Sequence, residues 1–185
     1  MTPGFCKWML TKVLGWTMDP PQENTGKAII LGVPHTSIWD CAIGYLYYRA
    51  YGRRFRVMIK KEAFFWPASW LLRSLGGFPV DRKNSGALVK SLIEEMEGTD
   101  DFHLVICPEG TRKAVKKWKT GYHVIAREAG VPVYMGYFNW KEKRVGIVHA
   151  PVELTDNARA DTDRIQAMYE DMHLTAKFPE MYITH

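Results

Sequence analysis

The chain has 185 residues, of which 46% are hydrophobic and 24% charged, and its formal net charge is +5. This size and composition indicate a single folded domain with a sizeable core and exclude a disordered chain. The mild positive charge suits phosphate-bearing ligands or an anionic membrane, but no nucleic-acid-binding motif accompanies it, so we predict no nucleic-acid partner.

The cysteines and histidines give no sign of a metal site. Cys6, Cys41 and Cys107 are odd in number and form no CxxC pair, so structural zinc and a disulfide framework are not expected. The histidines outside position 35 show no metal-ligand spacing. We therefore predict no bound metal or redox cofactor, and the cysteine usage favours a reducing compartment.

Residues 1–26 are predicted to form an N-terminal amphipathic segment. No apolar run here or elsewhere approaches the roughly 20 residues needed to span a bilayer. Two interpretations stay open: an interfacial helix lying on a membrane, or a terminal helix docked on the core. The residues at helical spacing are Phe5, Trp8, Met9, Val13 and Trp16, with Lys7 and Lys12 beside them.

Beyond this segment, strand-like and helix-like stretches alternate. Such alternation predicts a single-domain α/β fold with a mostly parallel sheet flanked by helices on both faces. Thr36 or Ser37 is expected to cap the first of these helices, and Gly52 to end it. The predicted order is strand 27–33, helix 38–51, strand 55–59, helix 66–75, strand 78–80, helix 87–97, strand 103–107, helix 122–129, a strand pair 131–138 and 144–149, and helix 162–176.

His35 directly follows the first strand, and Asp40 stands five positions later. An imidazole acts as a general base when a carboxylate accepts its Nδ1 proton, because this fixes the tautomer and leaves Nε2 free to take a proton. Taken alone, the pair is more simply a helix-terminal histidine beside an unrelated surface aspartate. Its position matters because sites in parallel sheets gather at the carboxyl ends of the strands.

A second polar motif, PEGTR at 108–112, follows the strand 103–107. Gly110 allows the backbone to approach an anion, Thr111 offers a hydroxyl, and Arg112 offers a planar fork for phosphate. Glu109 would repel a phosphate, so we expect it to hold an arginine or an acceptor hydroxyl. The simpler reading is a surface turn with a Glu/Arg ion pair.

Two further cationic positions are candidates for the same anion site. Arg82 ends the segment GGFPVDR at 76–82, and Lys60 lies at the end of the second strand. The alternative interpretation is that each is a solvated surface residue with no ligand, which is the usual case for a lysine at the end of a strand.

Taken together and in this order, the three motifs resemble those of the glycerolipid acyltransferase family, whose best-known members are the lysophosphatidate acyltransferases. The family combines a His-x4-Asp motif, a Gly/Phe segment ending in Arg, and a segment close to FPEGTR. A fourth, VPV-type strand is matched at 131–133, and the resemblance runs from about Ala28 to Tyr137. The chain departs from the pattern at Pro34, Cys107 and Met135, where Asn, Phe and Pro are frequent.

The resemblance implies that residues 27–185 form an acyltransferase domain. It implies an O-acyltransferase of phospholipid synthesis that moves a fatty acyl group from acyl-CoA or acyl carrier protein to a lysophospholipid, most simply 1-acylglycerol-3-phosphate. It also implies an enzyme peripheral to the cytoplasmic face of the membrane. In this scheme His35 is the base and Asp40 orients it, while the acceptor site comprises Arg82, Glu109, Gly110, Thr111 and Arg112, joined by Lys60.

Three alternatives remain open at the level of the sequence. The same acyl transfer could serve another acceptor, such as an amino-acid lipid or a different lysolipid. Cys107 or Cys41 could act as a thiol nucleophile. A non-catalytic module that binds lipid or acyl carrier protein would show no turnover at all.

Overall fold

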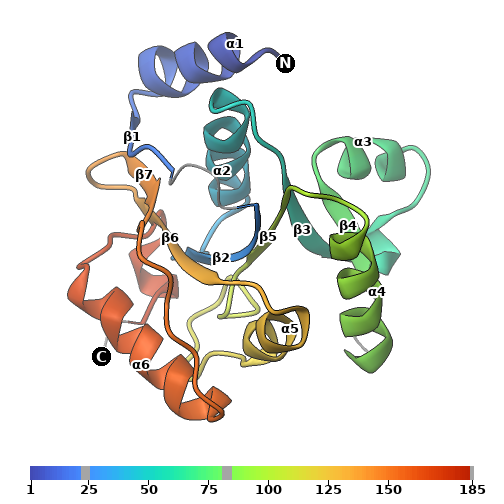
Figure 1. Cartoon of the computed structure of the whole chain (residues 1–185). Helices are drawn as coiled ribbons and strands as arrows, with labels where there is room; N and C mark the ends of the chain where they lie inside the picture. The colour runs from blue at the N-terminus through green and yellow to red at the C-terminus, as the bar shows by residue number, and fades with distance from the viewer. Residues whose placement is uncertain (22–25, 81–84, 184–185) are drawn as a thin grey trace.

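A seven-stranded sheet forms the centre of the molecule, with helices on both of its faces (Figure 1). The computed structural model describes residues 1–21, 26–80 and 85–183. The strand order is β1-β7-β6-β2-β5-β3-β4, and every pair is parallel except β6 with β7. The predicted α/β class with a mostly parallel sheet is therefore confirmed. The strands are β1 (Thr17–Met18), β2 (Lys27–Val33), β3 (Phe55–Lys60), β4 (Gly77–Val80), β5 (Phe102–Ile106), β6 (Val133–Asn139) and β7 (Arg144–Ile147).

The helices divide between the two faces because successive residues of a strand point to opposite sides. On β2, Ile29 and Leu31 join the core beneath α4, α5 and α6, whereas Ala28 and Ile30 join the core beneath α1 and α2. The helices are α1 (Pro3–Trp8), α2 (Ile38–Ala50), α3 (Ala68–Ser74), α4 (Ser85–Glu97), α5 (Gly121–Ala129) and α6 (Ala158–Asp171), with shorter helical turns at η1 (Met9–Val13), η2 (Lys61–Ala63) and η3 (Pro179–Met181).

The N-terminal segment is docked on α2 in this structure. Cys6 and Leu10 are fully buried in the core that α2 also lines, while Phe5 and Trp8 face outward. Within the described ranges, no helix combines the length and apolar character required to cross a bilayer.

The last helix differs from its predicted bounds. It begins at Ala158, four positions before the predicted start at 162, because Asn157 caps it by accepting a hydrogen bond from the Ala160 N–H at 3.0 Å. The helix ends at Asp171. His173, two residues later, has a φ of 49°, a left-handed conformation that is incompatible with a continued right-handed helix.

Two glycines place the edge strand β4 tightly against its neighbours. Gly76 has a φ of +88°, and a Cβ there would lie 2.2 Å from the carbonyl oxygen of Phe55. At Gly77 a Cβ would lie 2.6 Å from the carbonyl oxygen of Leu72 in α3. The GG of the second motif is therefore required by the backbone packing of this sheet edge.

We predict that Gly76→Ala destabilises the fold by about 3 kcal/mol, from left-handed strain plus the clash with the Phe55 carbonyl. Gly52→Ala is the matched control, because Gly52 also has a positive φ (+72°) but no atom within 4 Å of its added Cβ. The control should cost only about 1 kcal/mol. Chemical denaturation measures both values, and equal costs would contradict the packing argument.

Candidate active site

The first motif bridges the end of β2 and the start of α2. Ser37 caps α2 by accepting from the Trp39 N–H at 3.2 Å, and Asp40 in the first turn reaches back to the backbone. Its Oδ2 accepts from the N–H groups of Thr36 (2.9 Å) and Ser37 (2.8 Å). This reciprocal capping box fixes Asp40 against the loop that carries the histidine.

Asp40 is held from a second direction by the indole of Trp140. The Nε1–H of Trp140 donates to Oδ1 of Asp40 at 2.8 Å, so the carboxylate, only 1% exposed, accepts three N–H bonds. Oδ2 also lies 3.4 Å from Nδ1 of His35, whose side chain is 18% exposed. The structure thus brings the two predicted residues together, with Nδ1 facing the buried carboxylate. The helix N-terminus favours the negative charge at this position.

Trp140 was not identified from the sequence. It follows β6, a hundred residues from Asp40, and no local pattern connects the two positions. Its indole and that of Trp39 both face the ammonium of Lys177, at 4.6 Å and 4.8 Å from the ring centroids. The C-terminal segment therefore packs directly over the His35 loop, where the Phe178 N–H also donates to Thr36 Oγ1 at 3.3 Å.

Glu109 joins the third motif to the first. Its Oε1 accepts the backbone N–H of His35 at 2.9 Å, and Oε2 is buried with no hydrogen-bond partner among the described residues. Burial raises the pKa of Glu109 to about 7, although the bond from His35 opposes this shift. The expectation that Glu109 holds an arginine therefore gives way to a contact with the His35 backbone, and the free oxygen remains for an acceptor hydroxyl.

The rest of the third motif forms a turn after β5. Gly110 has a φ of +68° and donates its N–H to the carbonyl of Cys107 at 3.0 Å. A Cβ at Gly110 would lie 2.7 Å from Cε of Lys119, so this lysine lies across the turn. Thr111 Oγ1 accepts from the Lys113 N–H at 3.3 Å, and Arg112 is exposed.

The remaining predicted cations are placed differently. Lys60 is exposed at the end of β3, which lies two positions from β2 in the sheet. Arg82 falls at 81–84, outside the described residues. Among the residues that the structure describes, no group of three or more His, Cys, Asp or Glu side chains could hold a metal ion.

Both thiols near the site are poor nucleophiles. Burial raises the pKa of Cys107 well above its ordinary value, and burial also raises that of Cys41 although Arg112 opposes the shift. A protonated thiol attacks slowly. Burial therefore disfavours either cysteine as a nucleophile.

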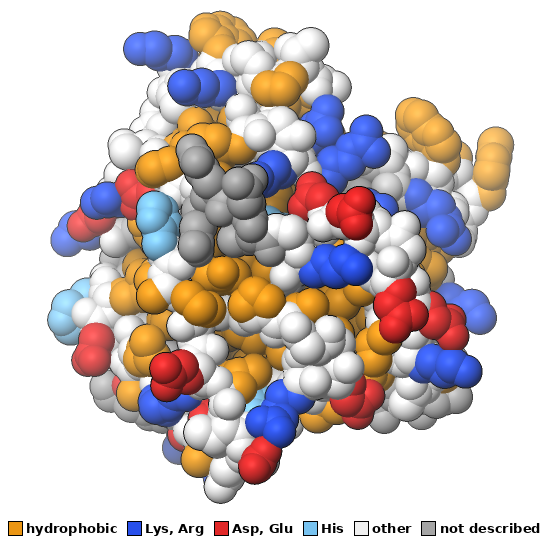
Figure 2. All heavy atoms as spheres, viewed as in Figure 1, with side chains coloured by type: hydrophobic (Ala, Val, Ile, Leu, Met, Phe, Trp, Pro, Cys, Tyr) orange, Lys and Arg blue, Asp and Glu red, His pale blue; other side chains and the backbone are white. Residues whose placement is uncertain are grey.

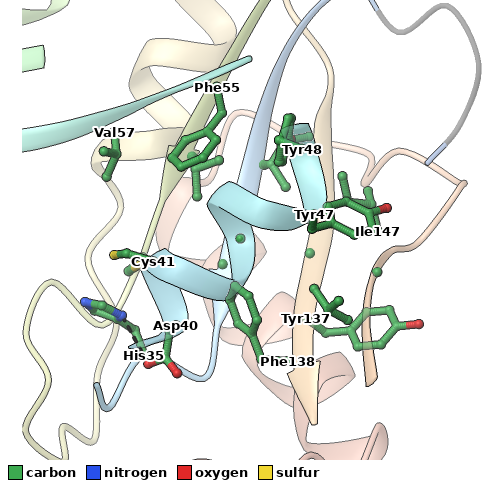
Figure 3. A pocket seen from close by; sticks show the side chains of 18 residues that line it. His35, Asp40, Cys41, Tyr47, Tyr48, Phe55, Val57, Tyr137, Phe138 and Ile147 are labelled. Carbon is green, nitrogen blue, oxygen red and sulfur yellow. Dashed lines mark ion pairs between the residues drawn. The ribbon is translucent and has the colours of Figure 1, made fainter. Parts of the chain in front are cut away.

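An apolar pocket, called the tunnel below, lies beneath α2 and has His35 and Asp40 among its lining residues (Figure 3). Its volume is about 50 Å³. Gly44 of α2 contributes no side chain to the wall, and neither does Gly32 on β2. A glycine inside a helix costs about 0.5–1 kcal/mol relative to alanine, so the space at Gly44 is maintained against local helix preference. The wall comprises Ile30, Gly32, His35, Asp40, Cys41, Gly44, Tyr47, Tyr48, Phe55, Val57, Val105, Cys107, Gly136, Tyr137, Phe138, Val145, Gly146 and Ile147.

On the β6–β7 side, the lining residue Tyr137 makes a polar contact. The hydroxyl of Tyr137 donates to Asp19, which Arg144 also binds at 2.8 Å and 2.9 Å. The tunnel therefore has the polar groups of His35 and Asp40 at one end and a largely apolar lining elsewhere.

Comparisons with known proteins find related sequences and a similar fold. The sequence model of the family described as Acyltransferase matches residues 19–136. A 1-acyl-sn-glycerol-3-phosphate acyltransferase of Streptococcus pneumoniae is 28% identical over 156 residues, which cover 78% of this chain and 58% of that protein. This chain therefore spans little more than half of that relative.

A solved structure shares the fold. The crystal structure of the 1-acyl-sn-glycerophosphate (LPA) acyltransferase PlsC from Thermotoga maritima aligns with a TM-score of 0.60 at 18% identity. The alignment covers 95% of this chain and 80% of that one. At this level of identity the likeness establishes the fold alone.

The buried Glu109 carboxyl predicts a specific pH dependence of stability. Because its pKa is raised from 4.5 to about 7 in the folded state, the folded protein keeps a proton that the unfolded chain releases. The free energy of unfolding should therefore fall as the pH rises through this window, by about 3 kcal/mol from this group.

Glu109→Gln removes the titrating group, so its stability relative to the parent should rise by about 3 kcal/mol between acidic pH and pH above 7. Urea denaturation of both proteins across this range measures the difference. A difference that stays constant with pH would show that Glu109 has the same pKa in the folded and unfolded states, so that its burial does not control its charge.

Proposed function

Because the chain belongs to the acyltransferase family, we propose that it transfers a fatty acyl group from an acyl thioester to a hydroxyl of a lysophospholipid. The observation that carries the proposal is the His35 imidazole, which faces the buried Asp40 at the entrance of the apolar tunnel. The acceptor we propose is 1-acylglycerol-3-phosphate, the compound in the name of the streptococcal relative, and the reaction would then belong to phospholipid synthesis.

The proposed reaction uses the acceptor itself as the nucleophile. Nε2 of His35 removes the proton from the acceptor hydroxyl while the oxygen attacks the thioester carbonyl. The C–O bond forms, the C–S bond breaks, and the imidazolium returns its proton to the leaving thiolate. Asp40 stabilises the imidazolium through Nδ1. The thioester already supplies an activated acyl group, so the scheme requires no bound metal or redox cofactor.

The two substrates would approach the histidine from different sides. The acyl chain of acyl-CoA or acyl carrier protein enters the tunnel beneath α2, where it is removed from water. The acceptor phosphate binds over the turn of the third motif, with Gly110, Thr111 and Arg112 as its partners and Arg82 and Lys60 as additional cations. Glu109 accepts a hydrogen bond from an acceptor hydroxyl.

We further propose that the protein works as a peripheral enzyme on the cytoplasmic face of the membrane. Residues 27–185 would form the acyltransferase domain, and residues 1–26 a segment whose exposed Phe5 and Trp8 face the membrane interface. The lysolipid acceptor resides in that interface, which supports this location.

One prediction of the proposed function concerns His35 as the general base. His35→Ala should lower kcat for acyl transfer by a factor of about 10² to 10⁴, the range that a general base contributes. Asp40→Asn should be nearly as damaging. The side-chain oxygen of the new asparagine would accept from the N–H groups of Thr36 and Ser37. The asparagine NH₂ group would then face the Nε1–H of Trp140, so that two donors oppose each other and this hydrogen bond is lost. Steady-state kinetics measure both variants, with circular dichroism to establish folding.

Cys107→Ala and Cys41→Ala are the matched controls for this prediction, since both line the tunnel but have no role in the scheme. Each should keep most of the activity, and intact-mass spectrometry should detect no acylated protein. Turnover of His35→Ala within a few-fold of the parent would rule out the histidine as base. An acyl-enzyme lost in one cysteine variant would assign the reaction to that thiol.

Another prediction of the proposed function concerns the phosphate of the acceptor. Arg112→Ala should raise the acceptor KM by about 10-fold to 100-fold, since a charge-assisted hydrogen bond contributes roughly 1.5–3 kcal/mol. Arg82→Ala should behave alike. Arg→Lys should recover part of the loss, because lysine keeps the charge but lacks the bidentate fork. The donor KM should change much less.

A double comparison separates phosphate recognition from a general effect on the site. An acceptor without phosphate should be a poor substrate for the parent, whereas the arginine variants should lose little on the same change. If the two penalties simply add, the arginines do not bind this phosphate, and an acceptor without phosphate becomes the better candidate.

A further inference from the structure

A second cavity lies at the other end of α2 from the histidine. Its volume is about 480 Å³, and four arginines are the only charged side chains among its described lining residues. His35 precedes the N-terminus of α2 and Arg49 lies in its last turn, so the length of the helix, roughly 18 Å, separates the two sites. The described lining is Met1, Tyr45, Arg49, Arg54, Phe55, Arg56, Arg73, Ser74, Leu75 and Gly76, of which Phe55 also borders the acyl tunnel.

The positive charge of this cavity is only partly neutralised within the protein. Arg56 pairs with Glu95 at 3.2 Å. Arg49 donates to the backbone carbonyl of Met1, and Arg73 lies over the ring of Phe64. Arg49, Arg54 and Arg73 form no ion pair with any other described residue. Three arginines that line one cavity, with no carboxylate among its described lining residues, fit a phosphate ligand, which accepts bidentate hydrogen bonds from arginine.

The α3 segment beside the cavity presents large apolar side chains to solvent. Phe65, Trp66 and Trp70 are 65%, 91% and 77% exposed. Trp70 precedes Arg73 and Ser74 by one helical turn, so it lies on the side of α3 that borders the cavity. In Figure 2, basic side chains gather between the hydrophobic groups of the N-terminal helix at the top and those that project at the right edge.

We propose that this face docks on an anionic phospholipid bilayer, with the arginine cavity binding a phosphodiester headgroup and the α3 aromatics entering the headgroup region. Tryptophan favours that region, and basic residues are attracted to anionic lipid at the same depth. Exposed aromatic groups beside a cationic cavity match these two properties of the headgroup region. An acidic protein is the less favoured occupant of this face, because it would need a complementary apolar pocket for each exposed aromatic side chain.

The proposal rests on the proposed function and deepens it, because it names the surface by which an enzyme with a membrane-borne acceptor would attach to the bilayer. The headgroup bound in this cavity is distinct from the acceptor, which is expected at the opposite end of α2. Variants of the docking face should therefore change membrane binding without changing acyl transfer to an acceptor dispersed in detergent. This separation makes failure of the docking proposal distinguishable from failure of the proposed function.

The test is co-sedimentation of the full chain with vesicles of phosphatidylcholine, alone or mixed with phosphatidylglycerol. Arg54→Ala with Arg73→Ala should weaken binding to the anionic vesicles by about 25-fold, since each basic residue near such a surface contributes about fivefold. Trp66→Ser with Trp70→Ser should weaken binding to both vesicle types by about 10-fold. Unchanged thermal unfolding establishes that the variants fold.

Matched controls remove the same groups elsewhere. Lys90→Ala with Lys141→Ala deletes two exposed cations, and Val124→Ser with Met168→Ser deletes two exposed apolar groups. Both should change vesicle binding less than threefold. Parent-like binding of the arginine variant, or an equal loss in the lysine control, would overturn the proposal. It would also be wrong if the arginine variant lost binding to an acidic acyl carrier protein while its vesicle binding stayed unchanged.

Discussion

The candidate active site and the start of α2 depend on one buried carboxylate. Asp40 is removed from water, and such a charge is tolerated only where hydrogen bonds replace its hydration. Two backbone N–H groups and one indole N–H provide them. These same bonds start α2, fix the loop after β2 and connect it to the chain beyond β6. The imidazole of His35 faces the same carboxylate, with Nδ1 at 3.4 Å from Oδ2. The interactions that stabilise the fold locally are therefore those that orient the candidate base.

Helix α2 contributes residues to three sites along its length: the His35–Asp40 pair, the tunnel and the cationic cavity. Its first turn holds Asp40, its middle leaves space at Gly44 for the tunnel, and its last turn contributes Arg49 to the cationic cavity. The tunnel has a largely apolar lining, so it would remove the hydrocarbon chain of the proposed acyl donor from water while the thioester stays beside His35. Glu109 adds a constraint, because its burial leaves one oxygen available at the entrance and raises its pKa into the neutral range.

Local patterns in the sequence predicted much of this arrangement. Alternating strands and helices implied the parallel sheet, and the positions of His35 and Glu109 directly after strands placed both on one rim. The contact between the His35 backbone and Glu109 is the physical result. Features formed by distant segments carried no local signal. Trp140 binds Asp40 across a hundred residues, and the arginine cavity combines residues from α2, β3 and α3. The early start of α6 depended on Asn157 as a cap, which hydrophobic periodicity does not reveal.

The most direct test of the central claim is a mass spectrum of the lipid products. Purified protein would be incubated with acyl-CoA or an acyl carrier protein thioester and a panel of lysolipids, in parallel with the His35→Ala variant. Our account predicts a diacyl product from 1-acylglycerol-3-phosphate that forms with the parent and is reduced by at least about 100-fold in the variant. No acylated product from any acceptor, or equal product from both proteins, would contradict it.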